Sequence, residues 1–162
     1  MKILNMIVDT FVAIMMVSSA FVLFTLTFLQ VVSRYVFQIP IPWSTDIIRL
    51  SFAYSIFFGA AWAAKKNNHL NLDFVLSLLN PKPRLALEFV IFSILTVFCG
   101  FIAFFGWRFT AFFGMIQSLP YLGIPMAIVY ISIPIGGFIM AFYYLQHAIN
   151  TILQLMPKNA ES

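Results

Sequence analysis

The chain has 162 residues, of which 62% are hydrophobic and only 9% are charged, and its mean hydropathy is +0.99. A water-soluble core of this length does not need so apolar a composition, which excludes an ordinary soluble domain and favours a polytopic membrane protein. The formal net charge is +4, but the nine basic residues are dispersed between apolar stretches. Charges spaced in this way set membrane orientation, so we expect no nucleic-acid partner.

We expect a single all-α integral membrane domain over residues 1–162, with transmembrane spans at about 10–33, 44–64, 85–107 and 125–149. The first span is longer than the hydrocarbon core of about 30 Å requires, so it is expected to tilt. Lys2 precedes an apolar run, as in a signal peptide, but the run continues to Val32 and Asp9 interrupts it. A retained helix therefore fits better than a cleaved leader.

The second span has recognisable signals at its start. Pro42 precedes it, Ser44 is placed to cap it, and Asp46 lies in the first turn, where the helix dipole favours a carboxylate. Asp46 and Arg49 are three residues apart on one helical face, so we expect them to pair.

A stripe of small side chains recurs at every fourth position of the same span. Its members are Ser51, Ser55, Gly59 and Ala63. Packing, rather than hydrophobicity, drives helix association in lipid, so small residues allow helices to approach closely. We predict a close helix contact here, within this chain or against a partner, and expect Gly59→Leu to disrupt assembly.

The connection between the second and third spans is polar with an amphipathic middle. The apolar side chains of Leu72–Leu79 share one helical face, which predicts a short helix lying flat in the headgroup region. Lys65 and Lys66 precede it and are expected to contact lipids of the inner leaflet. In the fourth span, Pro134 is expected to produce a kink, and Gly137 with Ala141 offers a second close helix contact.

The basic residues predict the orientation. Four spans place both termini on one side, and six of the nine lysines and arginines fall there. These are Lys2, Lys65, Lys66, Lys82, Arg84 and Lys158, whereas Arg34, Arg49 and Arg108 face the other side. The positive-inside rule then places both termini in the cytoplasm.

Residue patterns typical of catalysis, cofactor binding or metal binding are missing from the sequence. Cys99 is the only cysteine, which leaves no thiol pair and suggests a small apolar packing residue. His69 and His147 lie near span ends, whereas haem ligation would need them to face each other in the membrane. The middle of each span carries no ionisable residue of the kind that marks a translocation path. We therefore expect a non-enzymatic, cofactor-free accessory or scaffold protein.

The segment Arg34–Arg49 concentrates aromatic and polar side chains between the first two spans. Its large rings and two prolines predict a structured element embedded in the membrane interface. Its arginines suit two roles equally: membrane anchors with their heads at lipid phosphates, or contacts to a partner protein. The candidate partner-interface residues are Arg34, Trp43, Asp46, Arg49 and Gln117.

Taken as a set, these motifs resemble the small, DctQ-like membrane subunit of tripartite ATP-independent periplasmic (TRAP) transporters, over about residues 8–153. The first half supplies Arg34-Tyr35-x-Phe37, Trp43, Asp46, Arg49, Phe52, Phe58-Gly59-Ala60-Ala61, His69-Leu70 and Asp73. The second half supplies Gln117-Ser118, Leu122-Gly123-Ile124-Pro125 and Ile131-x-Ile133-Pro134-Ile135-Gly136. The family often carries two acidic residues after the tryptophan, where this chain has Thr45-Asp46 and therefore one carboxylate.

The resemblance implies a sodium-coupled secondary transporter in the bacterial inner membrane. A periplasmic binding protein would capture an organic acid, commonly a C4-dicarboxylate or a sialic acid, and a large membrane subunit would carry it with sodium. This chain would bind and scaffold the large subunit and help to dock the binding protein. Two alternatives stay open: an anchoring or assembly subunit of an unrelated complex, and a small stand-alone exporter acting as an oligomer.

Overall fold

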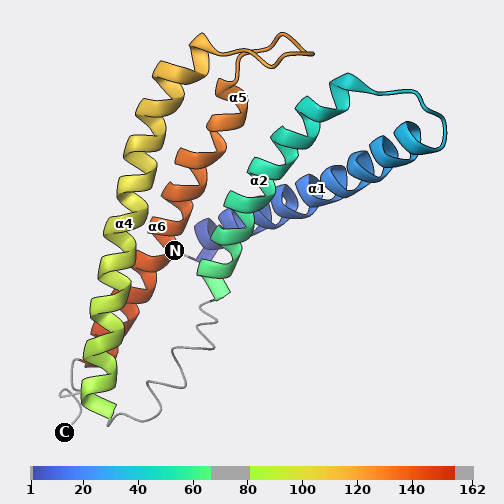
Figure 1. Ribbon diagram of the computed structural model, residues 1–162. Helices are drawn as coiled ribbons and strands as arrows, with labels where there is room; N and C mark the ends of the chain where they lie inside the picture. Colours follow the sequence, from blue (N-terminus) through green and yellow to red (C-terminus); the bar gives the residue numbers. More distant parts are fainter. Residues whose placement is uncertain (1, 67–80, 156–162) are drawn as a thin grey trace, which may run out of the picture.

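The computed structural model of the protein describes residues 2–66 and 81–155. These residues form five helices: α1 (Lys2–Tyr35), α2 (Pro42–Lys66), α4 (Pro81–Ile116), α5 (Ala127–Tyr130) and α6 (Ser132–Leu155) (Figure 1). The segments long and apolar enough to cross a membrane are Asn5–Tyr35, Pro42–Lys66, Leu87–Ile116 and Ala127–Leu153. The expected all-α class with four membrane-spanning helices is therefore confirmed. The amphipathic segment Leu72–Leu79 and His69 lie outside the described residues.

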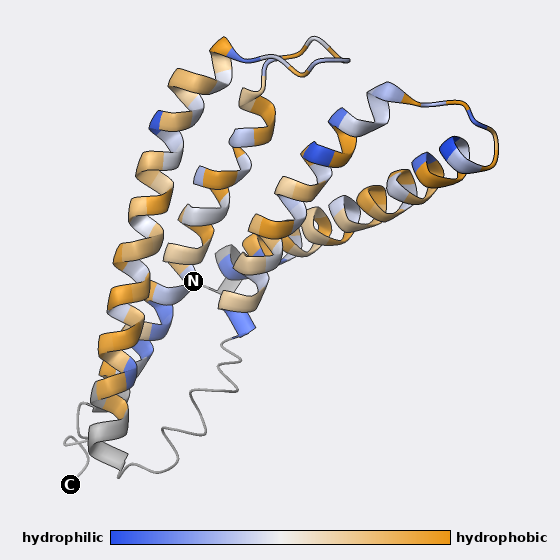
Figure 2. Ribbon diagram, in the orientation of Figure 1, coloured by the Kyte–Doolittle hydropathy of each residue, from blue (hydrophilic) through white to orange (hydrophobic). Residues whose placement is uncertain are grey.

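Hydrophobic residues predominate along the middle of each long helix, and hydrophilic residues gather toward the ends (Figure 2). We call the end that holds the α1–α2 and α4–α5 connections the outer end, and the opposite one the inner end, following the predicted orientation. That orientation stays a prediction.

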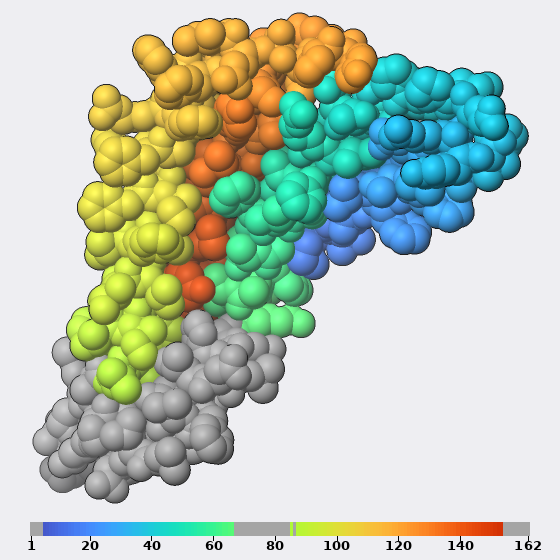
Figure 3. Space-filling model, viewed as in Figure 1, coloured from blue at the N-terminus to red at the C-terminus, as the bar shows by residue number. Residues whose placement is uncertain are grey.

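The helices pack as two pairs joined along one seam. Helix α1 packs on α2, α4 packs on α6, and α2 contacts α6. On the face shown in Figure 3, α6 lies between α4 and α2. The buried core draws on α1, α2, α4 and α6, and it consists of Val12, Phe58, Ala61, Ala64, Cys99, Ile139, Met140 and Tyr143. Cys99 thus packs as a small apolar residue, as expected.

Two adjacent glycines allow α6 to approach both of its neighbours. A Cβ atom added at Gly136 would lie 2.7 Å from the Cβ of Phe57 in α2, and one at Gly137 would lie 3.0 Å from the backbone nitrogen of Ala103 in α4. Since real Cβ contacts are longer than the first of these distances, only glycine fits at position 136. The expected contact at Gly137 is present, whereas the role of Gly136 was not foreseen.

The third span is longer than expected. Helix α4 continues past Trp107 to Ile116, because this aromatic stretch contains no proline and stays packed against the following helix. A Cβ added at Gly114 would lie 2.6 Å from the Cα of Ala127, which shows how tightly the last turns of α4 meet α5.

The fourth span is divided at Ile131, three residues before the proline that was expected to kink it. Pro134 has no N–H to donate to the carbonyl of Tyr130, so the helix loses a hydrogen bond across this turn. The flanking backbone bonds persist, from Ile131 N to Ala127 O (2.9 Å) and from Ile135 N to Ile131 O (3.3 Å). The proline therefore shortens the regular helix without separating its two parts.

Candidate functional site

The connection between α4 and α5 folds into a compact turn at the outer end. Leu119 N donates to Ile124 O (2.9 Å), and Met126 N donates to Gln117 O (2.9 Å). Gly123 closes the turn with a φ of +67°, a left-handed conformation that favours glycine. Contacts within the connection itself therefore define the conformation of this turn.

Asp46 of α2 attaches this turn to the first helical pair. Its Oδ2 accepts hydrogen bonds from the backbone N–H groups of Tyr121 (2.8 Å) and Leu122 (3.0 Å). The residue is only 1% exposed, and its Oδ1 has no hydrogen-bond partner within residues 2–66 and 81–155. A buried carboxylate that accepts two amides holds its position strongly, so Asp46 fixes the α4–α5 turn against the start of α2.

These contacts correct four expectations about the start of α2: that Pro42 precedes the helix, that Ser44 caps it, that Asp46 lies in its first turn, and that Asp46 pairs with Arg49. Asp46 does not pair with Arg49, which is exposed, because the carboxylate points instead to the turn that follows α4. Ser44 does not cap the helix: α2 already begins at Pro42, and the Ser44 hydroxyl donates to the carbonyl of Ile41 (2.7 Å). Proline suits a first helical position, since its missing N–H would have no helical partner there.

The candidate partner-interface residues divide into two groups. Arg34, Trp43, Arg49 and Gln117 are exposed at the outer end. The side chain of Gln117 already makes one contact within the chain, since its Oε1 accepts a hydrogen bond from the Tyr130 hydroxyl (3.0 Å). Asp46 is buried, so it cannot contact a partner directly. It contributes to this surface by holding the α4–α5 turn in position.

The small-residue stripe does not form one packing surface within the chain. Ser51 is buried, Ser55 and Gly59 are partly exposed, and Ala63 is exposed. Nothing lies within 4 Å of a Cβ added at Gly59. The reason is geometric: a step of four residues turns by about 40° more than a full helical turn, so the stripe winds away from the buried face. A contact with a partner protein stays a prediction.

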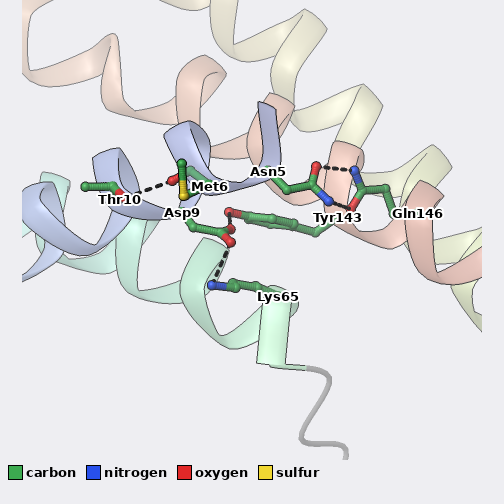
Figure 4. Close-up of polar contacts among 7 residues, drawn as sticks. All are labelled: Asn5, Met6, Asp9, Thr10, Lys65, Tyr143 and Gln146. Atoms are coloured by element: carbon green, nitrogen blue, oxygen red, sulfur yellow. Dashed lines mark hydrogen bonds and ion pairs between the residues drawn. The ribbon is translucent and has the colours of Figure 1, made fainter. Parts of the chain in front are cut away.

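A second polar cluster lies at the inner end and joins three helices (Figure 4). Lys65 of α2 forms an ion pair with Asp9 of α1 (2.9 Å), and the Tyr143 hydroxyl of α6 donates to the other Asp9 oxygen (2.7 Å). One turn away, Asn5 and Gln146 exchange two amide hydrogen bonds of 3.2 and 2.8 Å. We call these five residues the inner cluster.

Sequence reasoning noted Asp9 only as an interruption of an apolar run. The available signal was local: Asn5 and Asp9 are four residues apart on one helical face, and Tyr143 and Gln146 are three apart on another. Nothing in a single sequence shows that these two faces meet. Lys65 and Lys66 were expected to bind lipid as a pair. Lys65 forms an ion pair with Asp9, whereas Lys66 is exposed. Both ammonium groups lie over the Trp62 ring, at 4.5 and 5.7 Å from its centroid.

Among residues 2–66 and 81–155, no three His, Cys, Asp or Glu side chains lie together in a way that could hold a metal ion. In the described part of the chain, the ion pair between Lys65 and Asp9 and the hydrogen bonds between side chains of different helices lie at the inner and outer ends. Four apolar spans with polar connections at both ends define a multi-pass integral membrane protein.

Comparison with known proteins places the chain within that class. Residues 23–154 match the family described as "Tripartite ATP-independent periplasmic transporters, DctQ component". The chain belongs to this family, and it is a multi-pass protein of the inner membrane. The resemblance carried by the sequence motifs is thereby confirmed.

Three relatives illustrate the match. The chain is 30% identical to the sialic acid TRAP transporter small permease protein SiaQ of Vibrio cholerae, over 96% of this chain and 90% of the relative. It is 28% identical to the C4-dicarboxylate TRAP transporter small permease protein DctQ of Rhodobacter capsulatus, over 68% of this chain and 49% of the relative. A stretch of 62 residues is 34% identical to the sialic acid TRAP transporter permease protein SiaT of Haemophilus influenzae, covering 38% of this chain and 10% of that protein.

Proposed function

We propose that this chain is the non-catalytic small membrane subunit of a sodium-coupled, binding-protein-dependent importer of an organic acid. Relatives named for sialic acid and for C4-dicarboxylates support these two solute classes. In this proposal the chain binds a large membrane subunit, which carries the solute, and holds part of it in place in the bilayer.

The observation that carries the proposal is the exposure of α1. In the most apolar stretch of this span, only 6% of the residues are buried within the chain. The corresponding share is 44% in the span that contains α5 and α6. Phe21, Phe24 and Phe28 are 69%, 73% and 63% exposed. Side chains of this size bury large apolar areas when they meet a partner, so α1 offers an extended surface to a neighbouring membrane protein.

The outer end supports a second role, in docking a periplasmic binding protein. Arg34, Trp43, Arg49 and Gln117 are exposed there. Tryptophan and arginine are enriched among residues that dominate protein interfaces. The Asp46 contact holds the α4–α5 turn beside them, so the surface is formed before any partner arrives.

The test begins with purification of the tagged chain from its native membrane in a mild detergent. We expect one much larger polytopic protein to copurify in a fixed ratio. Recovery of the chain alone as a homo-oligomer would instead favour the stand-alone exporter, and recovery with an unrelated complex would favour an anchoring role.

The copurified pair is then reconstituted into proteoliposomes, and uptake of radiolabelled sialic acid and of a C4-dicarboxylate is measured. We expect uptake of one solute class only when a sodium gradient and the cognate soluble binding protein are both present. Uptake that continues without the binding protein would contradict the proposal.

A further inference from the structure

A cavity of about 430 Å³ lies at the outer end, between the end of α1 and the start of α2. This volume falls in the range of about 300–1,000 Å³ that is typical of small-molecule sites. Its polar lining comes from Gln30 and Arg34 of α1, Gln38 of the connection, Thr45 of α2 and Tyr121 of the α4–α5 turn. Among the residues that line it, all of them in the described part of the chain, Arg34 is the only charged one.

The polar groups are arranged to donate hydrogen bonds. The guanidinium of Arg34 has five N–H donors, and within the described residues no carboxylate pairs with it. Gln30 Nε2 donates to Thr45 Oγ1 (3.2 Å), so the Thr45 oxygen acts as an acceptor in that bond and its own proton can go to a ligand. A cavity that holds a cation and neutral donors suits an anion.

The dipole at the start of α2 favours the same charge, whereas the dipole at the C-terminal end of α1 opposes it. Pro42 and Thr45 line the cavity from the start of α2, where the positive end of the helix dipole attracts anions. Pro42 itself has no N–H, and Ser44 N already donates to Ile41 O (3.3 Å). Two carbonyls at the end of α1 are already occupied, since Val32 O accepts from Val36 N (2.8 Å) and Ser33 O accepts from Ile39 N (3.1 Å). These oxygens therefore do not face a ligand as free acceptors.

The connection holds one residue in an unusual conformation beside the cavity. Gln38 has a φ of +54°, in the left-handed region that non-glycine residues rarely adopt. The bonds between Ser33 and Ile39, through both the backbone and the Ser33 hydroxyl, hold this turn in place. Strain of this kind tends to be kept at binding sites, where it fixes a side chain for contact with a ligand.

The surroundings indicate where the anion comes from. Tyr35 ends α1, and Val36, Phe37 and Ile39 follow it; these four side chains are between 63% and 76% exposed. Such side chains are stable in a membrane interface, so the cavity opens at the depth of the lipid headgroups. We propose that it binds the phosphodiester of an outer-leaflet phospholipid, with Arg34 as the charged contact. This site does not depend on the transport role proposed above.

The test uses native mass spectrometry of the full chain, with any membrane protein that copurifies, after removal of bound lipid. Phosphatidylglycerol is then added back. The measured quantity is the fraction of protein that still carries one lipid molecule after collisional activation has removed the weakly bound ones. We expect Arg34→Gln to lower its retention roughly tenfold, as expected for loss of a charged hydrogen bond. Arg49→Gln is the matched control: it removes an exposed arginine at the same end that does not line the cavity, and it should retain lipid normally.

Thr45→Val is a second variant, which removes a hydroxyl from the cavity and leaves the charge unchanged. It tests the lipid site if Arg34→Gln cannot be purified. We expect it, too, to lower retention of phosphatidylglycerol. Equal retention by the wild type and both cavity variants would overturn the proposal. So would equal retention of diacylglycerol, which has the same chains without the phosphate. Displacement of the lipid by inorganic phosphate at an equal concentration would reject the lipid and assign the cavity to a soluble anion.

Discussion

At the scale of single residues, Asp46 shows how a short-range pattern and a long-range contact compete for one side chain. The spacing to Arg49 favours an ion pair on the surface of α2. The structure gives the carboxylate two amides that lie 75 and 76 residues further along the chain instead. Two charge-assisted bonds in a buried position outweigh one exposed pair, which is worth little in water. A single sequence cannot reveal this choice, because the competing donors are backbone groups of a distant turn.

The first prediction concerns this carboxylate. Asp46→Ala removes the acceptor for the amides of Tyr121 and Leu122, and bonds to charged groups contribute about 1.5–3 kcal/mol each. We expect a lower melting temperature in detergent and faster proteolysis of the α4–α5 turn. Arg49→Ala serves as the control and should leave both unchanged. An Asp46→Ala protein as stable as the wild type would show that the turn does not depend on this contact.

The second prediction concerns Arg49, which the structure leaves exposed beside the docking surface. Arg49→Glu reverses a charge at the proposed docking surface, so we expect lower uptake with the membrane complex recovered intact. Arg108→Glu makes the same charge change at another exposed arginine predicted to lie on the same side, and it should have less effect. If Arg49→Glu leaves uptake unchanged at limiting binding protein, Arg49 is a membrane anchor only.

At the scale of elements, the spans follow from composition, but the helix faces that pair do not. Hydropathy identifies four spans because the bilayer sets a minimum apolar length. The faces were harder to predict, as the stripe from Ser51 to Ala63 and the glycines of α6 illustrate. Both have small residues, yet a Cβ added at Gly59 meets nothing within 4 Å, whereas one added at Gly136 or Gly137 meets a neighbouring helix closely. Spacing within one helix does not tell which neighbour lies opposite.

A third prediction compares two glycines. Gly136→Ala places a Cβ 2.7 Å from Phe57, whereas Gly100→Ala in α4 meets nothing within 4 Å. Overpacking costs about 1–3 kcal/mol, which exceeds the helix propensity of up to about 1 kcal/mol that alanine gains over glycine. Thermal unfolding should therefore show Gly136→Ala destabilised and Gly100→Ala unchanged or stabilised. Equal effects of the two would mean that α2 and α6 are less tightly packed than the distances indicate.

The fourth prediction separates folding from assembly at Gly59. Because a Cβ added at this position meets no atom of the described residues within 4 Å, Gly59→Leu should melt at the wild-type temperature when the chain is isolated. We expect the same variant to copurify poorly with the large membrane subunit, since the leucine would keep a partner helix at a distance. Normal copurification would remove Gly59 from the proposed partner interface.

At the scale of the whole molecule, the class of the protein and its family could be predicted from the sequence, but its arrangement could not. The ordered motifs at Arg34–Arg49 and around Leu122 and Pro134 identify the family even without a structure. The pairing of α1 with α2 and of α4 with α6, and the seam between α2 and α6, depend on contacts between distant residues. The same holds for the inner cluster, whose partners in α1 and α6 are more than a hundred residues apart.

The fifth prediction addresses the inner cluster. Lys65→Met removes the cation but keeps a side chain of similar length, leaving the Asp9 carboxylate without its ion-pair partner. A charged bond of this kind is worth about 1.5–3 kcal/mol, so the melting temperature should fall. Asp9→Asn combined with Lys65→Met removes both charges and should recover part of the loss. A double variant less stable than either single one would indicate that the two charges act separately.

The seam between α2 and α6 also bears on the order in which the protein is built. Each of the two helical pairs is nearly continuous in sequence, so α1 and α2 can associate while the rest of the chain is still being synthesised. The partners that complete the molecule come later: Tyr121 and Leu122 for Asp46, Gly136 for Phe57, and Tyr143 for Asp9. If α1 and α2 enter the bilayer first, the amide donors for Asp46 arrive with the α4–α5 turn, and α6, the last described helix, then supplies the remaining contacts that hold the first pair.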